Sequence, residues 1–208
     1  MKVWKKNNSI NISLSFYPEE DGINEFLESI KEFGFVGNNL FKFDSKIEFD
    51  QNLVKSWLGN RNYKAELLFR KSRDGSTFND FHNKCDNKGI TIVFIETTKG
   101  YKFGGYTELQ WDNSGSKKDK STFIFSFNHK QKYIARNNNA SIYCSSSNPL
   151  WFGTYDFPEI YFNLDLNEGR SYDDNSNKTN AFILGRKLTN GEELWDVKEL
   201  EVHKIIYL

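Results

Sequence analysis

The sequence predicts an α+β fold that is mostly β, with two antiparallel sheets packed as a sandwich and a few flanking helices, mainly in the N-terminal part. Two observations lead to this prediction. Amphipathic helical patterns are confined to about the first 90 residues. After Gly89 the pattern changes to short extended runs, separated by turn residues at a spacing of roughly 8–12 residues. No internal repeat is evident, so one sandwich domain is expected rather than a repeat array.

Composition limits the classes of function. The 208 residues suit one domain with a short extension, and the 19 Phe residues supply a substantial core. The formal net charge is zero, with 28 basic and 28 acidic residues, which argues against a nucleic-acid-binding protein that neutralises phosphates. The sequence has no apolar run of membrane-spanning length, no signal-peptide pattern and too few cysteines for a disulfide framework. We therefore expect a soluble, cytoplasmic protein without membrane insertion.

Residues 1–40 are expected to form an N-terminal extension, made of a strand and an amphipathic helix, ahead of a domain at residues 41–208. The strand is expected within residues 1–18. The helix is predicted because apolar residues recur at helical spacing after a run of acidic side chains. These apolar residues are Ile23, Phe26, Leu27, Ile30 and Phe33.

Two further helices are predicted in the domain. One follows Asp50, which can cap its N-terminus, and precedes Gly59, which can end it. Its apolar stripe consists of Leu53, Val54, Trp57 and Leu58. The other is expected to start near Ser76, with Ser76 as its cap, and Gly89 can adopt a left-handed conformation beyond its end. One face of this helix carries Phe78, Phe81, His82 and Cys85.

Most of the remaining chain is predicted to form strands. Residues 63–72 form one, and residues 90–96 are so uniformly apolar and β-branched that they are expected to be buried on both faces. A turn signal at 97–100 makes residues 101–109 the hairpin partner. Further strands are expected at 123–127, with its Phe side chains on one side and Ile124 on the other, and at 132–136, 141–146, 159–166, 181–185 and 195–208. Polar loops are expected at 113–121 and 167–180.

His82 and Cys85 are one helical turn apart, close enough for a base to interact with a thiol. However, they share a face with Phe81, and a Cys that is buried among apolar side chains is inert because burial raises its pKa. We therefore interpret the pair as core packing, with a thiol-based antioxidant enzyme as an alternative. Cys85 and Cys144 could also form a disulfide, although the sequence does not require one. With two Cys and three His in the chain, a zinc site of the usual ligand spacing is not expected.

Gly104 and Gly105 lie within a predicted strand. This pair lacks the repetition of a propeller blade, and its surroundings match neither of the common phosphate-binding glycine patterns. We interpret it as a bulge or as a point of close approach, where a Cβ atom would clash. The acidic runs are interpreted as solvated loops or helix starts, and no nucleophile elbow is present. No catalytic residue, cofactor or metal ligand is therefore assigned.

Four aromatic residues lie near predicted loops, where they could line a binding site for a sugar or a peptide. They are Trp111, Trp151, Phe152 and Tyr155. A ligand-binding β-sandwich is therefore a second alternative function.

Several motifs occur in an order that resembles the TLDc domain family. They are FDSKI at 43–47, LVKSWL at 53–58, AELLFRKSRDGSTFNDFHNKCDNKGITIVFIET at 65–97, YKFGGYTELQW at 101–111, STFIFSFN at 121–128, EIYFNLDLNEGRSY at 159–172 and LEVHKI at 200–205. The resemblance covers roughly residues 41–207, and the succession of helix, CDNKG, strand, FGG and Trp is its most specific part. One departure is Ile90, where the family often carries Pro.

The resemblance implies a fold of two antiparallel sheets with flanking helices. It also implies a eukaryotic protein linked to protection from oxidative damage, which binds and modulates the vacuolar proton-pumping ATPase. Through that partner the protein would lie at endolysosomal or vacuolar membranes. The family has no accepted catalytic residue or cofactor, so the resemblance makes the motif residues structural and the chain a non-enzymatic interaction module. These residues are His82, Cys85, Gly89, Gly104, Gly105 and Trp111.

Overall fold

The structure is a computed structural model of the whole chain. It describes residues 2–6, 9–13, 42–135, 141–146, 148–153, 158–162, 165–171 and 185–208. The chain divides into two compact units, Met1–Asn38 and Asn39–Leu208. Three predictions lie outside the described residues: the amphipathic helix at 23–33, most of the strand at 181–185, and the placement of Tyr155.

The first unit contains an antiparallel hairpin. Its strands are β1 (Lys2–Lys6) and β2 (Ser9–Ser13), and Trp4 is paired with Asn11 near its middle. The sequence predicted a single strand-like segment within residues 1–18. Two short strands are found instead.

The second unit is built on one large antiparallel sheet of 11 strands, in the order β6-β9-β10-β11-β12-β13-β4-β5-β7-β8, with β3 also paired to β13. The strands are β3 (Tyr63–Arg70), β4 (Thr91–Thr97), β5 (Lys102–Thr107), β6 (Gly115–Lys117), β7 (Phe123–Ser126), β8 (Gln131–Ile134), β9 (Ile142–Ser145), β10 (Asn148–Gly153), β11 (Pro158–Phe162), β12 (Glu168–Arg170) and β13 (Leu194–Tyr207). The start of β13 pairs with β12, and its remainder pairs with β4 and β3. This 14-residue strand therefore belongs to both halves of the sheet.

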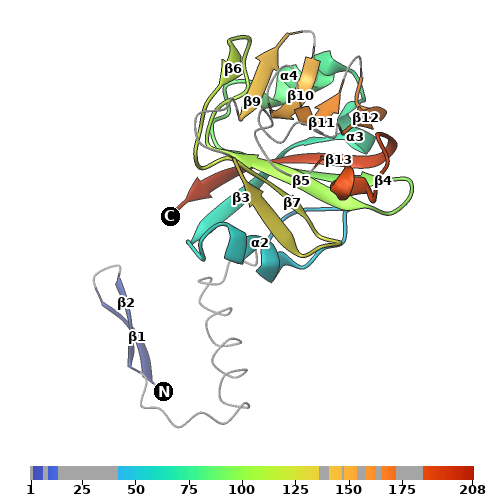
Figure 1. Cartoon of the computed structure of the whole chain (residues 1–208). Coiled ribbons are helices and arrows are strands. Elements are labelled where there is room, and N and C mark those ends of the chain that lie inside the picture. The colour runs from blue at the N-terminus through green and yellow to red at the C-terminus, as the bar shows by residue number, and fades with distance from the viewer. Residues whose placement is uncertain are drawn as a thin grey trace. The chain divides into compact units, whose positions relative to one another are not determined.

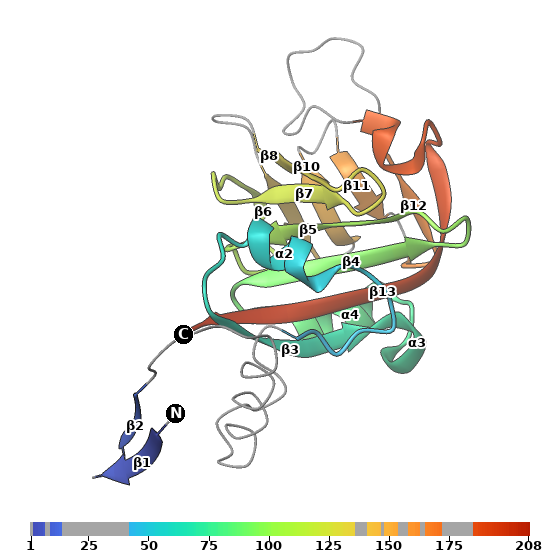
Figure 2. The same cartoon turned by 90° about the horizontal axis from the view of Figure 1, so that it is seen from below.

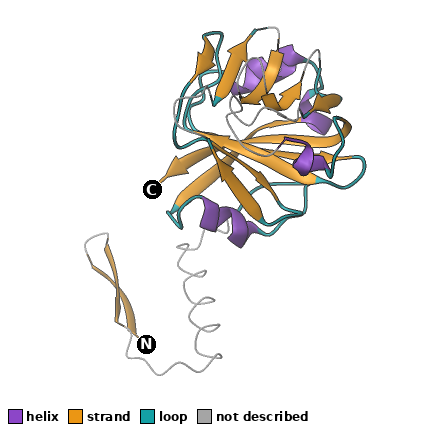
Figure 3. Ribbon diagram, viewed as in Figure 1, coloured by secondary structure: helices purple, strands orange, loops and turns teal. Residues whose placement is uncertain are grey.

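The two halves pack face to face, as Figure 1 shows: β9 to β12 lie above the half that contains β13, β4, β5 and β7. The other face of that lower half is covered by α2 (Gln51–Trp57), which Figure 2 shows lying across the strands. The remaining described helices are short, and Figure 3 shows how strands dominate the domain. The predicted α+β class, mostly β with few helices, is confirmed. None of the described helices is long and apolar enough to cross a membrane.

Two apolar cores lie on opposite faces of the lower half of the sheet. The strand β4 contributes to both, because Val93 and Ile95 enter the core between the two halves whereas Ile92 and Phe94 face α2. All seven residues of β4 are buried, as its uniform apolar sequence predicts. The strand β7 follows the predicted alternation, with Ile124 in the first core and its Phe side chains in the second.

The helix α2 begins and ends as predicted. The Asp50 side chain accepts hydrogen bonds from the backbone N–H groups of Asn52 and Leu53, which caps the N-terminus. Gly59 follows the helix with a φ of 75°, a left-handed conformation that glycine adopts without steric cost. Val54 and Trp57 are buried against the sheet, so this short amphipathic stripe closes the second core.

The helix α4 (Phe78–Cys85) differs from the prediction in its cap. Thr77 caps it through a reciprocal arrangement with Asp80, so the prediction of Ser76 was wrong by one residue. The backbone carbonyl of Ser76 instead accepts a hydrogen bond from the N–H of Leu166. The helix already ends at Cys85, and Gly89, with a φ of 79°, shapes the turn that leads into β4.

Three strands lie where the sequence indicated loops or gave no strand. The predicted loop at 113–121 contains β6, and the predicted loop at 167–180 begins with β12. The strand β10 was missed because its apolar residues were interpreted as loop aromatics. A short helix, α3 (Lys71–Asp74), and a 3₁₀ helix at Gly185–Thr189 complete the described elements.

Candidate functional site

Several of the motif residues meet in one part of the first core, which we call the Trp111 cluster: Phe81, Cys85, Gly105, Trp111 and Phe152. The Trp111 ring makes edge-to-face contacts with Phe81 and Phe152, at centroid distances of 5.9 and 5.6 Å. Its Nε1 donates a 2.9 Å hydrogen bond to Thr91 Oγ1 at the start of β4. Trp111 therefore joins α4, β4 and β10, and its side chain is 1% exposed.

The two glycines of β5 allow close packing on both of its faces. A Cβ atom on Gly104 would overlap the backbone carbonyl oxygen of Val93 in the neighbouring strand. A Cβ atom on Gly105 would overlap the ring of Phe152 in the facing half of the sandwich. Both glycines are buried, and both are required by packing.

The side chains of His82 and Cys85 lie in different surroundings. The His82 Nδ1 lies 2.9 Å from a carboxylate oxygen of Asp86, while Cys85 is fully buried. Burial raises the pKa of the Cys85 thiol well above its usual value, and the nearby charges of Asp86 and Asp74 raise it further. A thiol in these surroundings stays protonated at neutral pH and is a poor nucleophile.

Cys144 lies in β9 and is also buried and free. Burial raises the pKa of its thiol to about 11. The possible disulfide between Cys85 and Cys144 is therefore not formed. In the part of the chain that the structure describes, no group of three or more His, Cys, Asp or Glu residues is placed to hold a metal ion.

The three predicted loop aromatics that the structure describes do not form an exposed binding surface. Trp111, Trp151 and Phe152 are 1%, 6% and 0% exposed, and the indole N–H of Trp151 donates to the carbonyl oxygen of Phe162. Their interpretation as the lining of a sugar or peptide site was wrong. The reason is that these residues belong to or adjoin paired strands, whose inward-facing aromatic side chains fill the core.

A buried charged group, the Glu201 cluster, fastens the start of the domain to β13; it contains Ser45, Lys46, Arg70, Glu201 and His203. The Glu201 carboxylate accepts hydrogen bonds from Arg70 Nε at 2.7 Å and from the backbone N–H of Lys46 at 2.8 Å. Ser45 Oγ and His203 Nε2 complete its shell. Burial alone would raise the pKa of Glu201, but these hydrogen bonds lower it to about 2.

His203 is fully buried within this cluster. Because the Glu201 carboxylate can only accept hydrogen bonds, the Nε2 atom of His203 carries the proton and donates a hydrogen bond to Glu201. The Nδ1 atom of His203 then has no partner among the described groups. Burial lowers the pKa of His203, against the attraction of Glu201. Glu201 and His203 are both fully buried, so the geometry at the centre of the cluster indicates a structural anchor rather than a reactive site.

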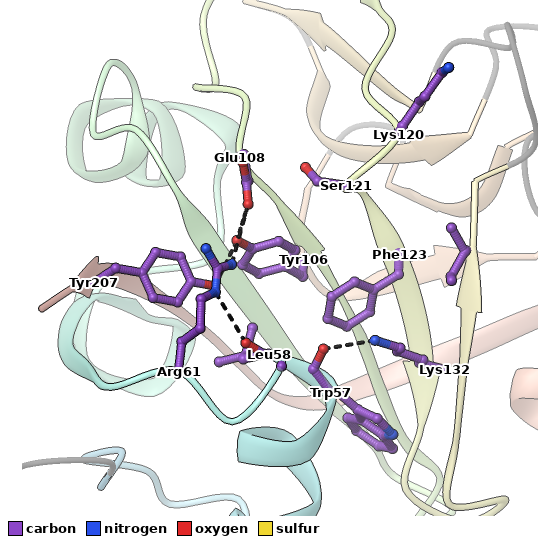
Figure 4. Close-up of a pocket in the computed structure, with 12 residues that line it drawn as sticks. Trp57, Leu58, Arg61, Tyr106, Glu108, Lys120, Ser121, Phe123, Lys132 and Tyr207 are labelled. Atoms are coloured by element: carbon purple, nitrogen blue, oxygen red, sulfur yellow. Dashed lines mark hydrogen bonds and ion pairs between the residues drawn. The ribbon is translucent and has the colours of Figure 1, made fainter.

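An open groove lies on the α2 face of the sheet, at one end of β5, β7 and β8, and we call it the β8 groove (Figure 4). Its volume is about 270 Å³. Residues of its floor and walls include Trp57, Arg61, Tyr106, Phe123, Lys132 and Ile134. The rings of Tyr106 and Phe123 are stacked with centroids 4.9 Å apart, which gives the groove an aromatic floor.

A polar chain lies at the Arg61 end of this groove. The hydroxyl of Tyr106 donates to Glu108 at 2.9 Å, so the hydroxyl of Tyr207, also 2.9 Å away, must donate to Tyr106. The Arg61 guanidinium lies 3.5 Å from the centre of the Tyr207 ring and 3.6 Å from Glu108. Burial and these contacts raise the pKa of Tyr106, so its hydroxyl is held neutral and serves as a fixed donor.

The opposite end of the groove is basic and apolar. Lys132 Nζ donates to the carbonyl oxygen of Trp57 at 2.8 Å and lies 5.0 Å from the centre of the Phe123 ring. Ile134 is 59% exposed, which is high for a large apolar side chain in a strand. None of these residues was predicted to belong to a binding site, because they come from segments far apart in the chain.

Comparison with known proteins decides the family. The sequence profile of the TLDc domain matches residues 42–206, which are most of the chain. The chain belongs to the TLDc domain family. The matched residues contain the Trp111 cluster, the Glu201 cluster and most of the β8 groove, so all three are features of the TLDc domain of this chain.

A curated relative of this TLDc chain is the MTOR-associated protein MEAK7 of Danio rerio. The two are 31% identical over 61 residues, which are 29% of this chain. The matched part is 14% of the relative, so the TLDc chain spans only a small part of that protein's length.

Proposed function

We propose that this TLDc chain is a protein-interaction module without catalytic activity, and that it binds subunits of the vacuolar proton-pumping ATPase and modulates their assembly. The observation that carries the proposal is the TLDc profile match over residues 42–206. Through this partner the chain would take part in protection from oxidative damage and would lie at the cytoplasmic side of vacuolar or endolysosomal membranes.

The surroundings of the two cysteines support a non-enzymatic module over a thiol-based antioxidant enzyme. A reactive thiol needs exposure and a lowered pKa, whereas Cys85 and Cys144 are buried with raised pKa values. Alkylation with iodoacetamide distinguishes the two functions. The module predicts that both thiols are unmodified in the native protein and modified in denaturant, with Cys85→Ala and Cys144→Ala identifying each thiol. Rapid native alkylation of either would favour the enzyme.

Affinity purification of the tagged chain from its own cells, followed by mass spectrometry, tests the partner. Recovery of several ATPase subunits is the expected result, and Cys85→Ala is expected to recover them equally if it folds. Preparations that repeatedly lack these subunits would overturn the ATPase assignment.

A second candidate partner comes from the name of the relative MEAK7, which is described as MTOR-associated. The same purification reads out both candidates. Recovery of mTOR without ATPase subunits would favour the second.

A further inference from the structure

We propose that the β8 groove binds an acidic peptide segment in extended conformation, which adds as a strand to the free edge of β8. The inference deepens the proposed function, since it names the surface and the partner chemistry that such a module would use. It rests on three features of the described residues: the backbone of β8, the charge of its surroundings, and the exposed apolar side chain of Ile134.

The strand β8 is the last in the order of the sheet and pairs with β7 in the described part of the chain. The backbone N–H of Ala135 donates to the carbonyl oxygen of Thr122, and the register places Tyr133 opposite Ile124. In an antiparallel ladder, pairs of residues that are hydrogen-bonded to each other alternate with pairs that are not. Ala135 and Tyr133 therefore bond to β7, whereas the residues that alternate with them do not. The N–H and C=O groups of Lys132 and Ile134 therefore point to the outer edge, where an added strand can pair with them.

The side chains of the same two residues, Lys132 and Ile134, line the β8 groove. In an antiparallel pair, residues opposite each other share a face of the sheet. A residue of an added strand that lies opposite Ile134 would therefore meet an apolar surface, and one opposite Lys132 would meet a cation. This arrangement favours a segment in which apolar and acidic side chains share one face.

The charge around β8 defines the partner further. In a chain with no net charge, positions 120–135 contain no Asp or Glu, whereas they contain Lys120, Lys130 and Lys132. The acidic residue that lines the groove, Glu108, already accepts a hydrogen bond from Tyr106 and lies near Arg61. The side chain of Lys120 extends from the rim (Figure 4). The field of the groove is therefore positive and attracts an acidic segment.

Lys120→Glu and Lys118→Glu are a matched pair of variants for the test. Both lysines are exposed and lie in the same loop, and the substitutions change the charge equally, but only Lys120 lines the groove. The probe is a fluorescent peptide that alternates glutamate and valine, titrated into the full chain by anisotropy. A second probe carries N-methyl groups on alternate residues, which blocks strand pairing at unchanged charge.

The expected result is saturable binding that Lys120→Glu weakens by about five- to tenfold and Lys118→Glu by less than about twofold. The N-methylated peptide is expected not to bind. Absence of binding, equal effects of the two variants, or equal binding of the methylated peptide would each overturn the proposal.

Light scattering of the free chain distinguishes a second copy as the occupant. A dimer that Ile134→Ser converts to a monomer would show that two β8 edges pair with each other, and this would also overturn the proposal. If the peptide does not bind, the groove proposal fails, but the proposed binding of ATPase subunits is still tested by their recovery. If the ATPase subunits are not recovered, the proposed partner fails, but a positive peptide result still supports the groove.

Discussion

The Trp111 cluster and the β8 groove are built in opposite ways from similar residue types. Both contain stacked or edge-to-face aromatic rings, but Trp111 is 1% exposed whereas Ile134 is 59% exposed. The cluster joins elements through packing and one indole hydrogen bond. The groove leaves backbone groups, a cation and an apolar side chain open to a partner. The buried motif residues of the cluster therefore hold the fold, whereas Lys120 and Ile134, two exposed residues at the groove, lie outside the family-like motifs.

Gly104→Ala tests the packed interior and is expected to cause the largest loss of stability. The new Cβ atom would overlap a backbone carbonyl that cannot move without breaking the pairing of β4 and β5. Overpacking of cores typically costs about 1–3 kcal/mol, and a clash with backbone costs more. We expect the variant to unfold or to remain insoluble, as measured by denaturant unfolding and circular dichroism.

Gly59→Ala is the control, since its Cβ atom meets open space and only the left-handed φ is strained, at about 1–2 kcal/mol. Equal stability of the two variants would contradict the close approach at Gly104.

Arg70→Met tests whether the Glu201 cluster anchors the domain. The substitution leaves the buried Glu201 carboxylate without its nearest cation. Removing one partner of a buried ion pair costs about 3–5 kcal/mol. Chemical denaturation should show a loss of this size. A loss below about 1 kcal/mol would mean that the cluster contributes little to stability.

The titration of Glu201 is expected to have a smaller effect on the unfolding free energy than the loss of Arg70. The folded pKa of Glu201, about 2, lies below its ordinary value of 4.5, so its stabilisation is complete above pH 4.5 and is lost as the pH falls toward 2. Glu201→Gln removes this titration. We expect the difference in unfolding free energy between the wild type and Glu201→Gln to narrow as the pH falls through this range. A constant difference would show that Glu201 does not carry the effect.

Lys120→Glu is expected to have the smallest effect on stability. Lys120 is exposed and makes no side-chain hydrogen bond or ion pair with a described residue, so the unfolding free energy should change by no more than about 0.5 kcal/mol. Thermal unfolding of the wild type and the variant checks this. A larger loss would place Lys120 among the structural residues and would weaken its use as a probe of binding.

Much of the fold could be predicted from the sequence, because its signals are local. The alternation around Ile124, the uniform burial of β4 and the cap at Asp50 follow from periodicity and hydrogen-bonding chemistry over a few residues. The cap of α4 was misplaced by one residue, because Ser76 and Thr77 are both good caps and tertiary contacts decide between them.

The surface could not be predicted in the same way. The β8 groove combines Arg61, Tyr106, Lys132 and Tyr207, which are brought together only by the sheet topology. The loop aromatics were misjudged because strand pairing, which is non-local, decides whether a Trp near a turn is buried. A lack of acidic residues from position 120 to 135 was the one local signal of the groove.

Recovery of ATPase subunits by the wild type, Cys85→Ala, Lys118→Glu and Lys120→Glu, compared in one affinity purification, tests the central claim most directly. The predicted result is full recovery by Cys85→Ala and Lys118→Glu and a marked loss by Lys120→Glu, with all four proteins folded. Full recovery by Lys120→Glu together with a loss by folded Cys85→Ala would contradict the account, because binding would then depend on the interior motif and not on the groove.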